Sequence, residues 1–108
     1  ILVLAGCAKN NNNGGTVFGG TGTVLYTSDT CPHCTIVKEY LAANDASNKA
    51  GLEQKEVSKN QTNAMELLGR AVDCGLDRNN VGVPLLWDSG KCFSGSEEII
   101  NFVKEKIK

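Results

Sequence analysis

The segment Cys31-Pro32-His33-Cys34 decides the fold assignment. It follows a short run of β-branched and aromatic residues at 23–27, which is typical of a buried strand. It also opens a stretch at 32–43 whose apolar residues recur at helical spacing, with proline at the first position, which predicts a helix. Cysteines three residues apart share one face of such a helix, with Cβ atoms about 5–6 Å apart. A small adjustment reaches the roughly 3.8 Å that a disulfide requires, so the pair can open and close without rebuilding the fold.

The two cysteines of this motif are expected to play different parts. Cys31 lies at the helix N-terminus, where unpaired backbone N–H groups and the positive end of the helix dipole stabilise a thiolate. It is therefore the expected nucleophile, and Cys34, one turn further and shielded, is the expected resolving thiol. A protonated His33 would add positive charge beside Cys31 and favour the reduced form.

A metal site and an inert structural disulfide are the competing interpretations of the motif. Zinc ribbons use two such cysteine pairs because tetrahedral zinc takes four ligands. The other downstream cysteines, Cys74 and Cys92, do not form a second pair of this spacing. Redox chemistry is the favoured hypothesis, with no metal expected. The alternative is a non-catalytic lipoprotein that binds copper or zinc through Cys31, Cys34 and His33.

The remainder of the chain predicts alternating strands and helices. Residues 52–57 resemble a weak edge strand, and Asn60 or Thr62 can cap a second helix that stops at Gly75. Strands at 84–87 and 91–93 flank a hairpin turn, and Ser96 is the expected cap of the last helix. The predicted order is βαβαββα.

This arrangement resembles the thioredoxin superfamily, and in a chain this short it is similar to glutaredoxin, over residues 23–108. The resemblance rests on the Cys31-to-Cys34 motif, on Val83-Pro84 opening a strand, and on Gly95 before the last helix. It implies an α/β, thioredoxin-like fold with a four-stranded mixed sheet flanked by helices. It also implies that Pro84 is cis against the active-site disulfide and that the Val83 backbone pairs with the substrate chain.

The resemblance further implies a thiol–disulfide oxidoreductase in which Cys31 and Cys34 carry the reaction. Its partners would be protein thiols or disulfides, or a redox partner protein, with no bound cofactor and with glutathione as a candidate co-substrate. Glu97 and Glu98 are then candidates for the ammonium end of glutathione. The family usually has threonine where this chain has Gly82, and Pro32-His33 resembles the dipeptide of Dsb-type oxidases.

The N-terminal region differs in composition from the rest. Leu4-Ala5-Gly6-Cys7 resembles the lipobox of bacterial lipoproteins, in which the cysteine sulfur receives a lipid. Asn, Gly and Thr dominate residues 10–22, which predicts a flexible tether. We therefore expect residues 1–22 to comprise a signal-peptide remnant, a lipidation site at Cys7 and a tether. The expected location is extracytoplasmic, with the membrane contacted only through the lipid anchor.

Composition bounds the remaining choices. A chain of 108 residues suits one domain, and 11 basic against 12 acidic residues leave no positive excess to attract nucleic acid. Of the five cysteines, Cys74 and Cys92 have no role in the motif or the lipobox. A structural disulfide between them and two cysteines that never meet are both compatible with the sequence.

Overall fold

The protein is described by a computed structural model that covers residues 22–108, so the predicted lipobox with Cys7 and the predicted tether up to residue 21 lie outside the described residues. The elements, in chain order, are β2 (Thr23–Thr27), α1 (Pro32–Ala43), α2 (Ala46–Ala50), β3 (Leu52–Glu56), α3 (Gln61–Asp73), the 3₁₀ helix η2 (Arg78–Asn80), β4 (Leu85–Asp88), β5 (Lys91–Ser94) and α4 (Ser96–Lys106).

The four strands form one mixed sheet in the order β3-β2-β4-β5. β2 pairs with β3 in parallel and with β4 antiparallel, and β4 pairs with β5 antiparallel. Strand β3, whose side chains are largely charged, lies at an edge, as its sequence predicts. The mixed sheet with flanking helices confirms the predicted fold class.

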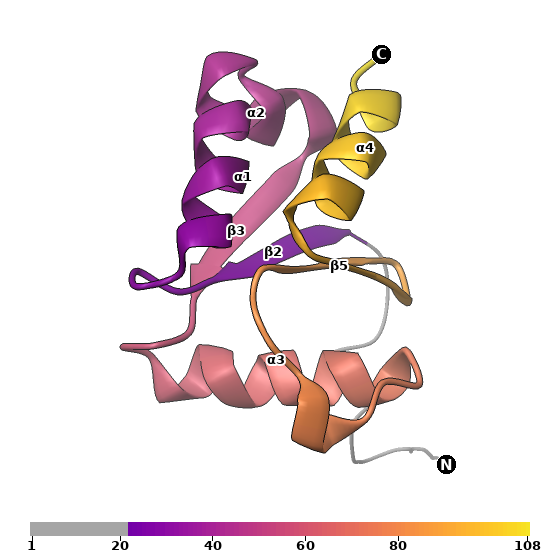
Figure 1. The fold of residues 1–108 in the computed structure, drawn as a ribbon. Coiled ribbons are helices and arrows are strands. Elements are labelled where there is room, and N and C mark those ends of the chain that lie inside the picture. Colours follow the sequence, from indigo (N-terminus) through magenta and orange to yellow (C-terminus); the bar gives the residue numbers. More distant parts are fainter. Residues whose placement is uncertain (1–21) are drawn as a thin grey trace, which may run out of the picture.

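The helices cover both faces of the sheet (Figure 1), with α1, α2 and α4 on one side and α3 on the other. Alternation along the strands divides the core accordingly. Leu25 and Leu86 belong to the cluster beneath α1 and α4, whereas Tyr26 and Trp87 belong to the cluster beneath α3. The central strand β2 is buried on both sides and therefore fixes the position of the segment that follows it.

Several element ends differ from the expectations. The short helices α2 and η2 were not predicted, because each is too brief to show periodicity. Asn60, not Thr62, caps α3, accepting a hydrogen bond from the Asn63 N–H. The expectation that Ser96 caps α4 is wrong: the cap is Gly95, with φ of 90°, a left-handed conformation that glycine adopts without a steric cost.

A buried polar network joins α3 to the sheet. The Tyr26 hydroxyl donates to Glu66 Oε2 at 2.6 Å, and Lys55 Nζ lies 2.9 Å from both oxygens of the same carboxylate. Burial raises the pKa of Glu66, but the hydrogen bonds from Tyr26 and Lys55 outweigh burial and hold this pKa below its ordinary value of 4.5. Glu66 is therefore an ionised carboxylate inside the core at neutral pH.

A disulfide joins the end of α3 to β5. Cys74 and Cys92 are bonded with an S–S distance of 2.00 Å and a Cα separation of 5.9 Å, which resolves the pairing that the sequence left open. Cys92 pairs across the sheet with Trp87, and Trp87 pairs with Val24 near the start of β2. The bond therefore fastens α3 at the end of the sheet far from Cys31.

Residues 22–108 contain no helix that is both long and apolar enough to cross a membrane.

Glu66 should make stability depend on acid pH. A carboxylate whose folded-state pKa is depressed stabilises the fold above its unfolded pKa, and this contribution is lost as pH falls through the folded value. We expect Glu66→Gln to lower the free energy of unfolding at pH 7 by about 1–3 kcal/mol. The difference in free energy of unfolding between this variant and wild type should become smaller below about pH 4.5. Urea titrations from pH 7 to pH 3 measure it, with Glu53→Gln on the exposed side of β3 as control. A gap that stays constant with pH would contradict the ionised core carboxylate.

Removing the Cys74–Cys92 bond should destabilise the protein without changing its fold. The bond closes a loop with a sequence separation of 18, and loop-closure entropy assigns such a crosslink about 3 kcal/mol. We expect the double variant Cys74→Ala, Cys92→Ala to show this loss in denaturant unfolding under non-reducing conditions. A loss under about 0.5 kcal/mol would mean that the denatured chain is not constrained by the crosslink.

Candidate dithiol site

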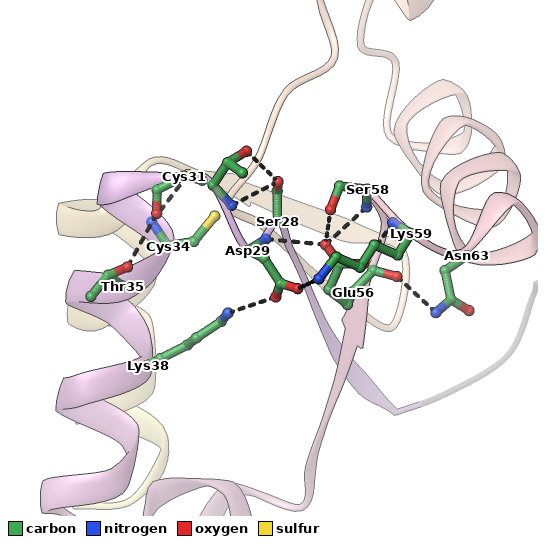
Figure 2. Close-up of polar contacts among 11 residues, drawn as sticks. Ser28, Asp29, Cys31, Cys34, Thr35, Lys38, Glu56, Ser58, Lys59 and Asn63 are labelled. Carbon is green, nitrogen blue, oxygen red and sulfur yellow. Dashed lines mark hydrogen bonds and ion pairs between the residues drawn. The ribbon is translucent and has the colours of Figure 1, made fainter.

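The two motif cysteines lie where β2 gives way to α1. Cys31 is the N-cap of α1, with extended backbone angles, and Pro32 occupies the first helical turn. The Cys34 backbone N–H donates to Cys31 Sγ at 3.1 Å (Figure 2). A sulfur atom thus takes the place that a serine, threonine or aspartate oxygen usually takes at a helix N-cap.

Exposure separates the two thiols. Both are free, and Cys31 is partly exposed whereas Cys34 is fully buried. Burial and a side-chain hydrogen bond with Cys31 raise the pKa of Cys34 to about 11. Cys34 is thus held as a neutral thiol near neutral pH, while Cys31 can be reached from outside.

The segment between η2 and β4 approaches Cys31 from the side. The Val83–Pro84 peptide bond is cis, and the Cys31 thiol donates to the Val83 carbonyl oxygen at 3.5 Å. The Pro84 carbonyl in turn accepts from the Gly95 N–H at 3.3 Å, so the same segment is tied to the start of α4. Three stretches far apart in sequence therefore meet beside the motif.

A groove of about 570 Å³ lies along this meeting point. It contains four of the residues singled out from the sequence as motif or groove residues: His33, Val83, Pro84 and Gly95. Its other lining residues are Asn80, Gly82, Ser94, Ser96, Glu97 and Glu98. Asn80 had not been singled out, and the unpredicted helix η2 is what brings it there.

The structure brings neither of the two other predicted cysteine features to this site. The Cys74–Cys92 disulfide belongs to the opposite end of the sheet, and the proposed lipidation site Cys7 is outside the described residues. Within residues 22–108, no group of three or more His, Cys, Asp or Glu side chains is placed to hold a metal ion.

The fold of the chain is similar to that of solved structures. No protein-family model and no curated protein matches the chain. Several solved structures are similar to it, among them two glutaredoxins. The holo form of glutaredoxin C1 from Populus tremula x tremuloides has a TM-score of 0.57 and 17% identity, over 86% of this chain and 77% of that chain. Oxidized glutaredoxin 2 from Chlamydomonas reinhardtii has a TM-score of 0.55 and 15% identity, over 86% and 80%. The thioredoxin-like fold of the glutaredoxin type is thereby confirmed.

The asymmetry between the thiols is directly measurable. With a pKa of about 11, only about one thousandth of Cys34 is thiolate at pH 8, and burial also blocks reagents. We expect N-ethylmaleimide to modify Cys31 at least tenfold faster than Cys34 in the reduced protein, as followed by peptide mass spectrometry. The Cys31→Ala variant serves as control, since slow labelling of Cys34 should persist there. Equal labelling of both cysteines in the native protein would contradict the assignment.

Proposed function

We propose that the protein is a thiol–disulfide oxidoreductase in which Cys31 is the attacking thiol and Cys34 the resolving thiol. The observation that carries the proposal is the placement of Cys31. Its sulfur caps a helix N-terminus, lies beside the Val83 carbonyl, and has a buried thiol one turn away. Helix N-termini stabilise a thiolate through N–H groups and the helix dipole, and the thiolate is the reactive form of cysteine.

The reaction in the reducing direction follows from these positions. The Cys31 thiolate attacks one sulfur of a substrate disulfide, forming a mixed disulfide and releasing the other sulfur as a thiolate. Cys34 then attacks Cys31 Sγ, closing the Cys31–Cys34 disulfide, and its proton passes to the departing substrate thiolate. The substrate gains two electrons and the protein loses two. With an oxidised protein and a substrate dithiol, the same steps run in reverse.

The groove beside Cys31 is the proposed substrate site. Val83 and Pro84 line the groove, and the Val83 carbonyl oxygen lies 3.5 Å from Cys31 Sγ, so an extended chain segment bound along the groove would bring its sulfur close to Cys31. Protein thiols and disulfides, or a redox partner protein, are thus the proposed substrates. Glutathione is the proposed small co-substrate, with Glu97 and Glu98 available to its ammonium group. A Cβ atom added at Gly82 meets nothing within 4 Å, so the groove is open at that wall.

We also propose that the protein acts outside the cytoplasm, held to a membrane through a lipid on Cys7. Three features support this location. Residues Leu4-Ala5-Gly6-Cys7 resemble a lipobox, and residues 10–22 have the composition of a tether. The Cys74–Cys92 disulfide also suits an oxidising compartment, because structural disulfides are rare where thiols are kept reduced.

The test is a pair of single substitutions with opposite consequences. Cys31→Ser should abolish exchange with a model disulfide substrate, because it removes the nucleophile. Cys34→Ser should leave the attack intact and accumulate a mixed disulfide, visible as a dithiothreitol-sensitive mass increase on Cys31. Exchange is followed by the reduction of insulin or of a glutathione mixed disulfide. If both variants trap the substrate equally, or wild type exchanges neither substrate, the proposed function is wrong.

A further inference from the structure

One carboxylate at the end of β3 holds two loops together. Glu56 Oε2 accepts the backbone N–H of Asp29 at 3.1 Å and that of Ser58 at 3.0 Å, and it also accepts the Ser58 hydroxyl (Figure 2). Glu56 Oε1 accepts the backbone N–H of Lys59 at 2.8 Å. Asp29 precedes α1 while Ser58 and Lys59 precede α3, so the side chain joins segments 27 residues or more apart in sequence.

The register of the sheet explains why Glu56 reaches this place. Strands β2 and β3 are parallel with Thr27 opposite Glu56, and the Val57 N–H donates to the Thr27 carbonyl at 2.8 Å. The carboxyl ends of both strands therefore lie side by side. The loops that leave them emerge together, and the Glu56 side chain lies between these loops.

The loop that Glu56 holds is the one that delivers Cys31. In the Ser28-Asp29-Thr30 turn, the Cys31 N–H donates to the Ser28 carbonyl at 3.2 Å, which closes the turn on the reactive cysteine. The Asp29 carboxylate makes the reciprocal contact, lying 3.0 Å from Lys59 Nζ and 3.9 Å from Lys38 Nζ on α1. The turn is thus tied to both the β3–α3 loop and the motif helix.

Glu56 is ionised over the whole range in which thiols react. The Ser58 hydroxyl, followed by the backbone N–H groups of Lys59, Asp29 and Ser58, lowers the pKa of Glu56 to about 2. A charged acceptor makes shorter and stronger hydrogen bonds than a neutral one. The hydrogen bonds that the Glu56 carboxylate accepts from the two loops are therefore unaffected by pH changes near neutrality.

We propose that Glu56 is a positioning residue of the dithiol site, which fixes the turn before Cys31 so that its sulfur stays over the N–H groups of α1 and beside Val83. Glu56 touches no substrate and carries no step of the reaction. Its role is deduced from the contacts of Asp29, and it deepens the proposed function of the same site. Thiolate stabilisation by backbone N–H groups depends on short distances, such as the 3.1 Å between Cys34 N and Cys31 Sγ.

Two effects of changing Glu56 oppose each other and must be separated. Removing its negative charge favours a nearby thiolate. Removing its hydrogen bonds loosens the turn before Cys31 and thereby disfavours the thiolate. Salt screens the charge effect, since the Debye length falls to about 3 Å at 1 M. The matched control is Glu53→Gln, which removes a charge from an exposed position of the same strand.

The experiment measures the rate of Cys31 alkylation by iodoacetamide at pH 7 and 1 M NaCl, in a Cys34→Ser background, with thermal unfolding in parallel. We expect Glu56→Ala to slow alkylation about two- to tenfold, the equivalent of one net hydrogen bond. Glu56→Gln keeps one side-chain oxygen and should fall between Glu56→Ala and wild type. Glu53→Gln should match wild type. The alkylation rate should be reduced even well below the unfolding temperature of each variant. At such temperatures the protein is folded, so a purely global loss of stability would not change the rate.

The outcomes separate this proposal from the proposed function. Rates for Glu56→Ala and Glu56→Gln equal to that of Glu53→Gln would overturn the positioning role; if Glu56→Ala does not fold, the Glu56→Gln rate decides alone. Alkylation of Cys31 needs no disulfide exchange. If the Glu56 variants are alkylated more slowly but the wild-type protein exchanges no disulfide, the positioning role stands and the oxidoreductase function is rejected. If the wild-type protein exchanges disulfides but the Glu56 variants are alkylated at the control rate, the oxidoreductase function stands and the positioning role is rejected.

Discussion

The hydrogen bond from the Cys34 backbone to Cys31 Sγ is the contact around which the rest of the site is arranged. It requires the chain to leave the buried strand β2, turn within three residues and enter α1 with a sulfur at the cap. Burial of β2 on both faces provides the rigid start of that path. The same contact places Cys34 one turn inside, where burial keeps it neutral, and leaves Cys31 beside Val83, which lines the groove. The different chemistry of two identical side chains thus follows from one turn of helix.

Much of this arrangement can be predicted from local sequence. Proline at 32, apolar spacing after it and the buried run before it are strong short-range signals, and the edge position of β3 follows from its charges. The hairpin is equally local: Ser89 and Gly90 both adopt positive φ, as a two-residue turn between antiparallel strands requires. Each of these features depends on residues within about ten positions of one another.

The features that could not be predicted arise between distant segments. The helix η2 brings Asn80 to the groove, and it could not be predicted because its three residues are too few to show a periodic pattern. Cys74 and Cys92 meet only because α3 crosses the sheet with its end beside β5. Glu56 resembles any charged residue of an edge strand until the parallel register of β2 and β3 places its carboxylate between two loops. Sequence patterns predict which face of a strand or helix a residue occupies, but they do not predict which distant loop lies next to that residue.

The direction of β2 has a mechanical consequence. The strand begins beside Gly22, whose backbone is hydrogen-bonded to Ser89 on the β4–β5 hairpin, and it ends four residues before Cys31. Its five residues span about 17 Å, so Gly22 lies at one end of the sheet and the partly exposed Cys31 at the other. Tension applied through the N-terminus would load β2 along its length and be resisted by its ladders to β3 and β4 in shear. Val83 and Pro84, which line the groove, lie beside the far end of that strand, because the next residue, Leu85, pairs with Tyr26.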